Sequence, residues 1–204
     1  NATGHTTTSV KLQPKRLTAY VDISKKLIAQ DNAGVEASIR ADIVKAINDK
    51  LEATIFGENP KTDSYPAGIF NGASLKTINT FKQLVDFEAE LDDANVVGEK
   101  KYVLSNKSRA ALRAMQKGEG IGLVLENAAV DGTPAFYTSN VPANKLVYGD
   151  FSNLAIGSWG DIDITVDEYT QATKGCVRLV INAYFDAVKL REAAFVYGDT
   201  TANA

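Results

Sequence analysis

The sequence predicts an α+β fold. A long helical pattern lies near the N-terminal end, and a long alternating pattern typical of a β-hairpin lies near the C-terminal end. Between them, the stretch 73–149 combines helix-like and strand-like segments and predicts a small α/β unit. We therefore expect two sub-domains, with the Gly- and Pro-containing crossing Gly57–Ser74 as their boundary.

The longest helical pattern covers Val35–Phe56. Its apolar residues recur at every fourth position, namely Val35, Ile39, Ile43, Ile47, Leu51 and Ile55. Residues four apart lie on one helical face, and each step of four drifts about 40° around the axis. We therefore expect a structural spine whose two ends pack against different neighbours. Asp31 or Asn32 is expected to cap its start, and Gly57 to end it in a left-handed turn.

Two further patterns precede this helix. Leu17–Ser24 alternates apolar and polar residues, which predicts a half-buried strand. Ser24–Gln30 then reads as a short helix with Ser24 as its cap. Residues 1–16 are polar and Thr-rich, so we expect an extended segment that needs a partner to become ordered.

The expected α/β unit consists of helices and short strands. Thr80–Ala94 and Ser105–Lys117 have helical spacing, and Tyr102–Leu104 between them is a short apolar strand. Gly132–Val141 contains a turn, a short aromatic strand and a second turn, and Lys145–Phe151 is strand-like.

The C-terminal third predicts a long β-hairpin. Leu154–Trp159 is strand-like, and Ile162–Val166 alternates with acidic and threonine residues as a one-sided strand. The polar loop Glu168–Lys174 follows, and Val177–Phe185 alternates again as a long strand. The alternation changes phase at Ala187–Val188, which predicts a bulge or a change of sheet at that point.

Composition excludes several classes of partner. The chain has 204 residues, of which 45% are hydrophobic and 23% charged, as in a soluble globular protein. Its 22 basic residues are scattered among 25 acidic ones, which disfavours specific nucleic-acid binding. No apolar run approaches the roughly 20 residues of a membrane helix, so we expect no membrane partner. Cys176 is the only cysteine, which excludes an intrachain disulfide and fits a reducing compartment.

The residue types that common catalytic sites need are nearly absent. His5 and Cys176 are each the only residue of their type, which disfavours Ser-His-Asp, Cys-His and zinc sites. Gly118–Gly122 follows a helix rather than a strand, so it indicates a helix stop and a loop rather than a phosphate-binding site. Asp161 and Asp163 belong to the solvated side of a strand. We expect no catalytic, metal or cofactor site, and a scaffold that functions in an assembly. A small α/β enzyme or ligand-binding module remains the alternative, and it requires a deep pocket with convergent polar groups.

The order of several segments resembles the major capsid proteins of tailed bacteriophages. These segments are LTAYVDISKKLI, VEASIRADIVKAINDKLEATIFG, the crossing with Pro66–Ile69, YVLSNKSRAALRAM, GTPAFYTSNVP, VYGDFSNLAIGSWGDIDITVDEY and VRLVINAYFDAVKLREAAFVYG. The Gly149-Asp150-Phe151 step after an apolar strand is the most specific local match. The likeness runs from about Lys11 to Tyr197.

The resemblance implies the Hong Kong ninety-seven-type capsid fold. A peripheral domain would comprise 1–72 and 150–190, with 1–16 as a remnant of an extended loop, and an axial domain would comprise 73–149 and 191–204. The family builds icosahedral shells from hexamers and pentamers around double-stranded DNA, which it contacts non-specifically. A scaffold, a portal and a maturation protease are the further partners implied, and assembly is expected in the bacterial host cytoplasm. An encapsulin-like compartment shell, which encloses protein cargo, has the same fold and is the second alternative.

The resemblance also implies contacts between neighbouring subunits. The loop Asp167–Gly175 would lie near threefold positions, and loops around 131–144 near the capsomer centre. The candidate contact residues are Lys15, Arg16, Asp167, Glu168, Tyr169, Thr170, Lys174, Tyr137, Asn140 and Asn144. Some members cross-link a loop lysine to a hairpin asparagine, but Glu168–Lys174 contains no asparagine, so that chemistry is not expected. Because the sequence starts at Asn1 rather than Met, we expect a piece of a longer product that is monomeric or weakly associated on its own.

Overall fold

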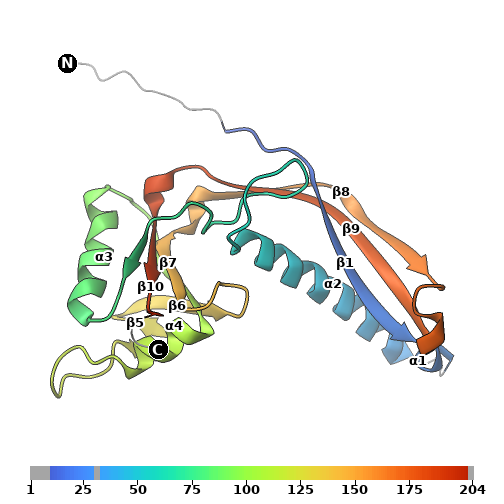
Figure 1. Cartoon of the computed structure of the whole chain (residues 1–204), viewed down its shortest axis with the longest axis horizontal. Coiled ribbons are helices and arrows are strands. Elements are labelled where there is room, and N and C mark those ends of the chain that lie inside the picture. Colours follow the sequence, from blue (N-terminus) through green and yellow to red (C-terminus); the bar gives the residue numbers. More distant parts are fainter. Residues whose placement is uncertain (1–9, 30–32, 202–204) are drawn as a thin grey trace.

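The computed structural model describes residues 10–29 and 33–201, which form a compact part and a long arm (Figure 1). The arm contains β1 (Lys15–Ser24), α1 (Lys25–Ala29), α2 (Ala33–Ile55), β8 (Leu154–Asp167) and β9 (Cys176–Lys189). The compact part contains β2 (Leu75–Thr77), α3 (Phe81–Asp93), β3 (Lys100–Ser105), α4 (Asn106–Ala114), β4 (Leu125–Glu126), β5 (Ala129–Val130), β6 (Thr133–Thr138), β7 (Lys145–Asp150) and β10 (Phe195–Asp199). Short 3-10 turns lie at Phe151–Asn153, Ala172–Lys174 and Glu192–Ala194.

Each part has its own sheet. In the described residues, the arm has a three-stranded sheet with the order β1-β9-β8. The compact part has a seven-stranded sheet with the order β2-β10-β7-β3-β6-β5-β4. Figure 1 shows β8 and β9 running from the compact part to the far tip of the arm. The predicted α+β class is confirmed by this mixture of helices and sheets.

The helix α2 packs along the arm sheet, mainly on β1 and also on β9. Ile43 and Ile47 are 9% and 6% exposed and pack against Ile181 of β9, which is 1% exposed. Ile39 is half-buried in the same cluster. Of the described every-fourth positions, Ile43, Ile47 and Ile55 are buried and Ile39 and Leu51 are half-buried. The proposed caps Asp31 and Asn32, and the side chain of Val35, lie outside the described residues.

The C-terminal end of α2 contacts a different core. Phe56 packs against the large core of the compact part, with its ring centroid 6.4 Å from that of Phe151. The carbonyl of Ile55 accepts a hydrogen bond from Ile69 N at 2.6 Å, which attaches the crossing loop to the helix end. The middle of α2 and the residue that follows its C-terminal end thus have different neighbours.

The prediction of a left-handed Gly57 is wrong. Gly57 is absent from the positive-φ glycines of the described chain. Glycine is required there by close approach, because a Cβ would lie 2.8 Å from the carbonyl oxygen of Ala53 and closer still to the side chain of Asn59. A Cβ on Gly68 would in turn collide with the Gly57 carbonyl. The two glycines allow the chain to double back beneath the helix end.

The long hairpin forms, but its irregularity lies elsewhere than predicted. No bulge occurs at Ala187–Val188, where the ladder pairs Ala187 with Ile156 and Val188 with Ala155. The register shift lies on the partner strand between Trp159 and Asp163, and Gly160 adopts a φ of +68° there.

The phase change in β9 has a different cause. The pairing of β1 with β9 ends at Lys15 and Phe185. Beyond that point Asp186 and Ala187 are both buried, at 2% and 7% exposure. The backbone N–H of Gln13 donates to the Asp186 carboxylate at 2.9 Å and so replaces the missing strand contact.

The alternating strand Ile162–Val166 presents its apolar side to solvent. Ile164 pairs with Ile181 and Val166 with Leu179, so these four side chains share one face of the sheet. Because α2 covers β1 and β9, the residues Ile162, Ile164 and Val166 stay 46%, 44% and 57% exposed.

The compact part surrounds an apolar core centred on β3, β7 and β10. Leu84, Phe87 and Leu91 of α3 are buried against it, and Thr80 caps this helix in a capping box with Gln83. The predicted second helix ends at Ala114 rather than Lys117. Met115 is extended, and Gln116 forms an isolated β-bridge with Leu123, which closes the loop that contains the glycines.

Candidate intersubunit surfaces

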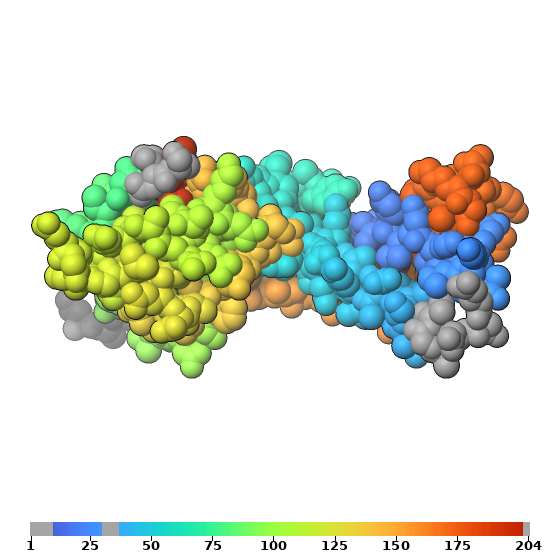
Figure 2. Space-filling model, turned by 90° about the horizontal axis from the view of Figure 1, so that it is seen from below, coloured from blue at the N-terminus to red at the C-terminus, as the bar shows by residue number. Residues whose placement is uncertain are grey.

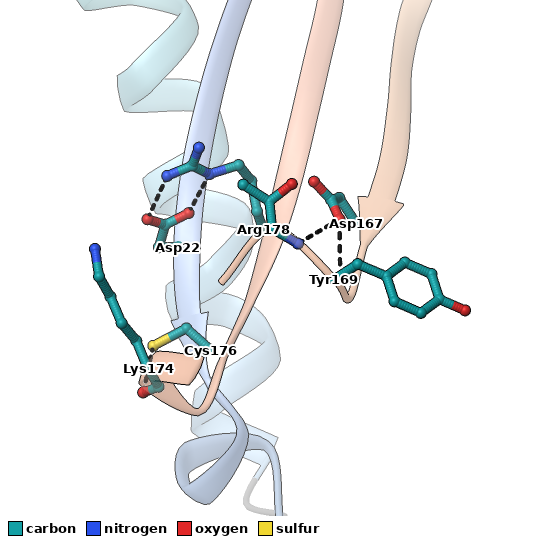
Figure 3. A network of polar contacts seen from close by, with 7 residues as sticks. Asp22, Asp167, Tyr169, Lys174, Cys176 and Arg178 are labelled. Carbon is teal, nitrogen blue, oxygen red and sulfur yellow. Dashed lines mark hydrogen bonds and ion pairs between the residues drawn. The ribbon is translucent and has the colours of Figure 1, made fainter. Parts of the chain in front are cut away.

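An ion pair ties β9 to β1 near the tip of the arm (Figure 3). Arg178 donates from Nε and Nη2 to the two carboxylate oxygens of Asp22, at 2.6 and 2.8 Å. This hydrogen bonding lowers the pKa of Asp22 and raises the pKa of Arg178. The guanidinium also lies 4.1 Å from the ring centroid of Tyr20, which is 61% exposed. Because Asp22 belongs to β1 and Arg178 to β9, the ion pair joins two neighbouring strands of the same chain.

The loop at the tip is ordered by Asp167. Its carboxylate accepts hydrogen bonds from the backbone N–H groups of Tyr169 and Thr170, at 2.9 and 3.0 Å. A hydrogen bond from the Thr170 side chain and these backbone bonds lower the pKa of Asp167. Figure 3 shows the Tyr169 ring pointing away from the strands, and its side chain is 89% exposed. A large aromatic side chain is thus presented outward on a braced turn.

The predicted contact residues divide into two groups that lie far apart. Asp167, Glu168, Tyr169, Thr170 and Lys174 gather at the tip of the arm, whereas Tyr137, Asn140 and Asn144 belong to the compact part (Figure 1). Arg16 is exposed on β1.

Lys15 differs from the expected exposed contact residue. Its side chain is only 3% exposed, and its ammonium group donates to the Thr62 carbonyl of the crossing loop. The sequence could not indicate this, because Thr62 approaches β1 only through the tertiary fold.

Two of the compact-part candidates also make contacts within the chain. Asn140 donates from Nδ2 to Glu52 of α2 at 3.0 Å. Asn144 has a φ of +63°, and its carbonyl accepts from Thr200 N at 2.8 Å. Tyr137 is 49% exposed and lies under the guanidinium of Arg109, 3.7 Å from its ring centroid.

Sequence reasoning missed an exposed apolar site beside the tip. Leu27 and Ile28 of α1 are 42% and 47% exposed, and α1 has no buried residue. The backbone N–H of Lys25 donates to the Gly175 carbonyl at 2.8 Å, which fixes α1 beside the tip loop. In the sequence, the adjacent apolar residues Leu27 and Ile28 within a five-residue helix were the signal that could have indicated this exposed site.

The described residues contain no group of three or more His, Cys, Asp or Glu side chains placed to hold a metal ion. Within the same part of the chain, no helix is long and apolar enough to cross a membrane.

Known proteins similar to this chain are capsid proteins. The major capsid protein of Halomonas phage phiHAP-1 is 27% identical over 194 residues, which cover 92% of this chain and 32% of that protein. The major capsid protein of Klebsiella oxytoca phage phiKO2 is 26% identical over 180 residues, which cover 76% of this chain and 42% of that protein. The matched region therefore spans 32% and 42% of the length of these two curated relatives, less than half of each.

Solved capsid structures share the fold. The capsid of an empty GTA particle is 19% identical with a TM-score of 0.68, over 98% of this chain and 80% of that chain. The structure from Gordonia phage Cozz is 16% identical with a TM-score of 0.62, over 98% and 77% of the two chains. A virus-like particle from Pyrococcus furiosus is 13% identical with a TM-score of 0.56, over 91% and 76% of the two chains.

The family assignment rests on sequence over nearly the whole chain. A sequence model of the phage capsid family matches residues 1–200. The relatives are named as capsid proteins and not as enzymes, in agreement with the expected structural role. The mixed helix and sheet architecture agrees with the capsid structures in fold. This chain belongs to the phage capsid family.

Proposed function

We propose that this chain is the structural region of a major capsid protein that assembles an icosahedral shell from hexamers and pentamers around double-stranded DNA. The match of residues 1–200 to the phage capsid family carries this proposal. The elongated molecule, with exposed apolar and aromatic side chains along the arm, supports it. These surfaces are poorly explained by the stability of a single chain.

The domain division follows from the same proposal. The peripheral domain comprises 1–72 and 150–190, and the axial domain comprises 73–149 and 191–204. The separate sheets of arm and compact part support this division. The helix α2 acts as the spine, because its middle and the residue that follows its C-terminal end pack against different cores.

Contacts between subunits are proposed at both ends of the molecule. The tip residues Asp167, Glu168, Tyr169, Thr170 and Lys174 meet neighbours near threefold positions, with Arg16 further along β1. Tyr137, Asn140 and Asn144 lie toward the capsomer centre. The high exposure of Tyr169 and Tyr137 supports these assignments. Lys15 is not proposed as a contact, because its side chain is buried and donates to Thr62 of the same chain.

The further partners follow from shell assembly. We propose that a scaffold, a portal and a maturation protease act on the assembling shell in the bacterial host cytoplasm, and that the finished virion holds DNA without sequence-specific contacts. The net charge of −3 supports weak contact with DNA, because tight binding requires clustered Lys and Arg.

A compartment shell that encloses protein cargo is the second candidate. The fold alone permits it, whereas the family model and both curated relatives are named for phage capsids. The phage shell is therefore the better supported of the two.

Electron microscopy of the complete gene product, expressed with its neighbouring genes, tests the proposal. We expect closed icosahedral particles that contain nucleic acid when the packaging genes are present. Particles that contain protein cargo and no nucleic acid would favour the compartment shell. Absence of particles under all assembly conditions would contradict both candidates.

A further inference from the structure

A hollow beside α4 combines two guanidinium groups with an aromatic ring. It has a volume of about 410 Å³ and is lined in part by Arg109, Arg113, Tyr137, Leu123 and Leu125. Arg109 and Arg113 lie four residues apart, so they share one face of α4. Arg109 stacks on Tyr137 with 3.7 Å between its guanidinium carbon and the ring centroid. This stacking leaves the edges of the guanidinium free to donate hydrogen bonds.

The hollow carries an incompletely neutralised positive charge. Among the described residues, no carboxylate oxygen lies within 4 Å of either guanidinium. Glu126 also lines the hollow, but one of its oxygens accepts the backbone N–H of Leu123 at 2.8 Å. Two cations against one anion leave a net charge of +1 in the lining. Leu123 is 38% exposed and adds an apolar wall.

A complementary surface lies at the C-terminal end of α3 and on the turn that follows it. Asp93 is exposed, and no cation lies within 4 Å of it in the described part of the chain, whereas its neighbour Asp92 is paired with Lys100. Val97 in the turn that follows α3 is 93% exposed. A carboxylate at the helix end and an apolar side chain four residues later match a hollow that offers guanidinium groups and an apolar wall.

The turn after α3 is held in place by contacts with the rest of the compact part. Arg191 donates to the carbonyls of Ala94 and Asn95, at 2.5 and 3.4 Å. Val96 beside them is 6% exposed and anchors the turn in the core. A preordered turn loses little conformational entropy when it docks.

The turn and the hollow lie toward opposite ends of one strand. The turn immediately precedes β3, and α4 immediately follows it. A strand of six residues is about 20 Å long, so the two surfaces cannot meet within one chain. Figure 2 shows α4 and the residues after it, in yellow-green to yellow, on the lower face of the compact part.

We propose that the Arg109–Arg113 hollow binds the carboxylate of Asp93 from a second copy of this chain, with Val97 of that copy against Leu123. The contact is head-to-tail, because it joins different surfaces of the two copies, and such contacts generate rings when the rotation between successive copies closes. It rests on the proposed shell function and assigns a contact within its rings.

Charge reversal in the complete gene product tests the pairing. We expect Arg113→Glu and Asp93→Lys each to lower the yield of particles about tenfold, and the double variant to restore most of it. Arg113 is the better target of the two arginines, because Arg109 also stacks on Tyr137 within the chain. The matched control is Lys107→Glu on the same helix, which is exposed and outside the hollow and should leave the yield unchanged.

Three other outcomes overturn the inference. Wild-type yields from Arg113→Glu and Asp93→Lys would show that neither side chain holds neighbours together. Two defective single variants without recovery in the double variant would exclude the pairing. Normal particles that lose only their nucleic acid would assign the hollow to phosphate groups instead. Absence of particles from the unaltered product would reject the shell function itself, which separates the two failures. If Arg113→Glu proves insoluble, Asp93→Lys and its rescue by Arg113→Asp decide the question.

Discussion

Single residues show how the fold distributes its charges. Arg178 and Asp22 are drawn together across the arm sheet, and the hydrogen bonds lower the pKa of Asp22. In the compact part Glu88 has the opposite environment. Burial raises its pKa, although a hydrogen bond donated by Tyr102 partly opposes the shift. Tyr102 is itself fully buried and stacks on Tyr148 with ring centroids 4.5 Å apart.

We expect Glu88→Gln to stabilise the chain at neutral pH. Because the folded-state pKa of Glu88 is raised, its contribution to stability is fully present below the unfolded pKa and is lost as pH rises through the folded pKa. Glutamine still accepts the Tyr102 hydroxyl but carries no charge. The gain in free energy of unfolding should therefore be larger at pH 7 than at pH 4, measured by urea denaturation. A gain that does not depend on pH would contradict this assignment.

At the scale of elements, α2 is the clearest case of a pattern that determines packing. Its apolar residues occur every fourth position, and Ile43 and Ile47 are buried against the arm sheet. Neighbouring Val44 points elsewhere and is 54% exposed. The helix therefore offers a buried position and an exposed one of similar chemistry for comparison.

We expect Ile47→Asp to lower the free energy of unfolding by about 3–5 kcal/mol, because it places an unpaired carboxylate in the apolar cluster. This loss should leave the chain largely unfolded or insoluble. Ile39→Asp should have a smaller effect, since Ile39 is half-buried. Val44→Asp is the matched control and should change stability by no more than about 0.5 kcal/mol. Circular dichroism during urea unfolding measures all three. A cooperatively folded Ile47→Asp variant of normal stability would show that α2 does not organise the arm.

For the whole molecule, the long arm is supported along one face by α2 and keeps apolar side chains exposed on β8 and α1. These exposed side chains need neighbours to be buried. Exposed apolar side chains of this kind mark surfaces that contact other molecules.

We expect the 204-residue chain to be monomeric or weakly associated at micromolar concentration. Light scattering of this chain beside the complete gene product measures the difference, and only the complete product should form particles. Stable rings or shells of the 204-residue chain alone would show that it contains all the contacts that assembly needs.

Long periodic segments made most of the fold predictable. The helix α2, the strand β1 and the paired strands β8 and β9 each repeat their pattern over several turns or alternations. By contrast, β2, β4 and β5 have two or three residues each, which is too short for any period to appear. They form because neighbouring strands offer hydrogen-bonding partners, which is tertiary information.

The candidate surfaces were only partly predictable. A polar loop between two alternating strands indicated the exposed tip, and the structure places Tyr169 there with 89% exposure. The Arg109–Tyr137 contact joins α4 to β6, and no local pattern in the sequence connects them. Lys15 was expected at the surface and is buried, because the crossing loop folds over it.

The sequence by itself determined the periodic elements, the absence of common catalytic residue types and the likeness to capsid proteins, because each depends on residues in local order. The tertiary structure alone decided where the hairpin is irregular, which apolar faces stay uncovered and how the arginine hollow forms. Those features depend on contacts between segments far apart in the chain. In β8 the pattern predicted an apolar face, but only the position of α2 decided that this face meets solvent.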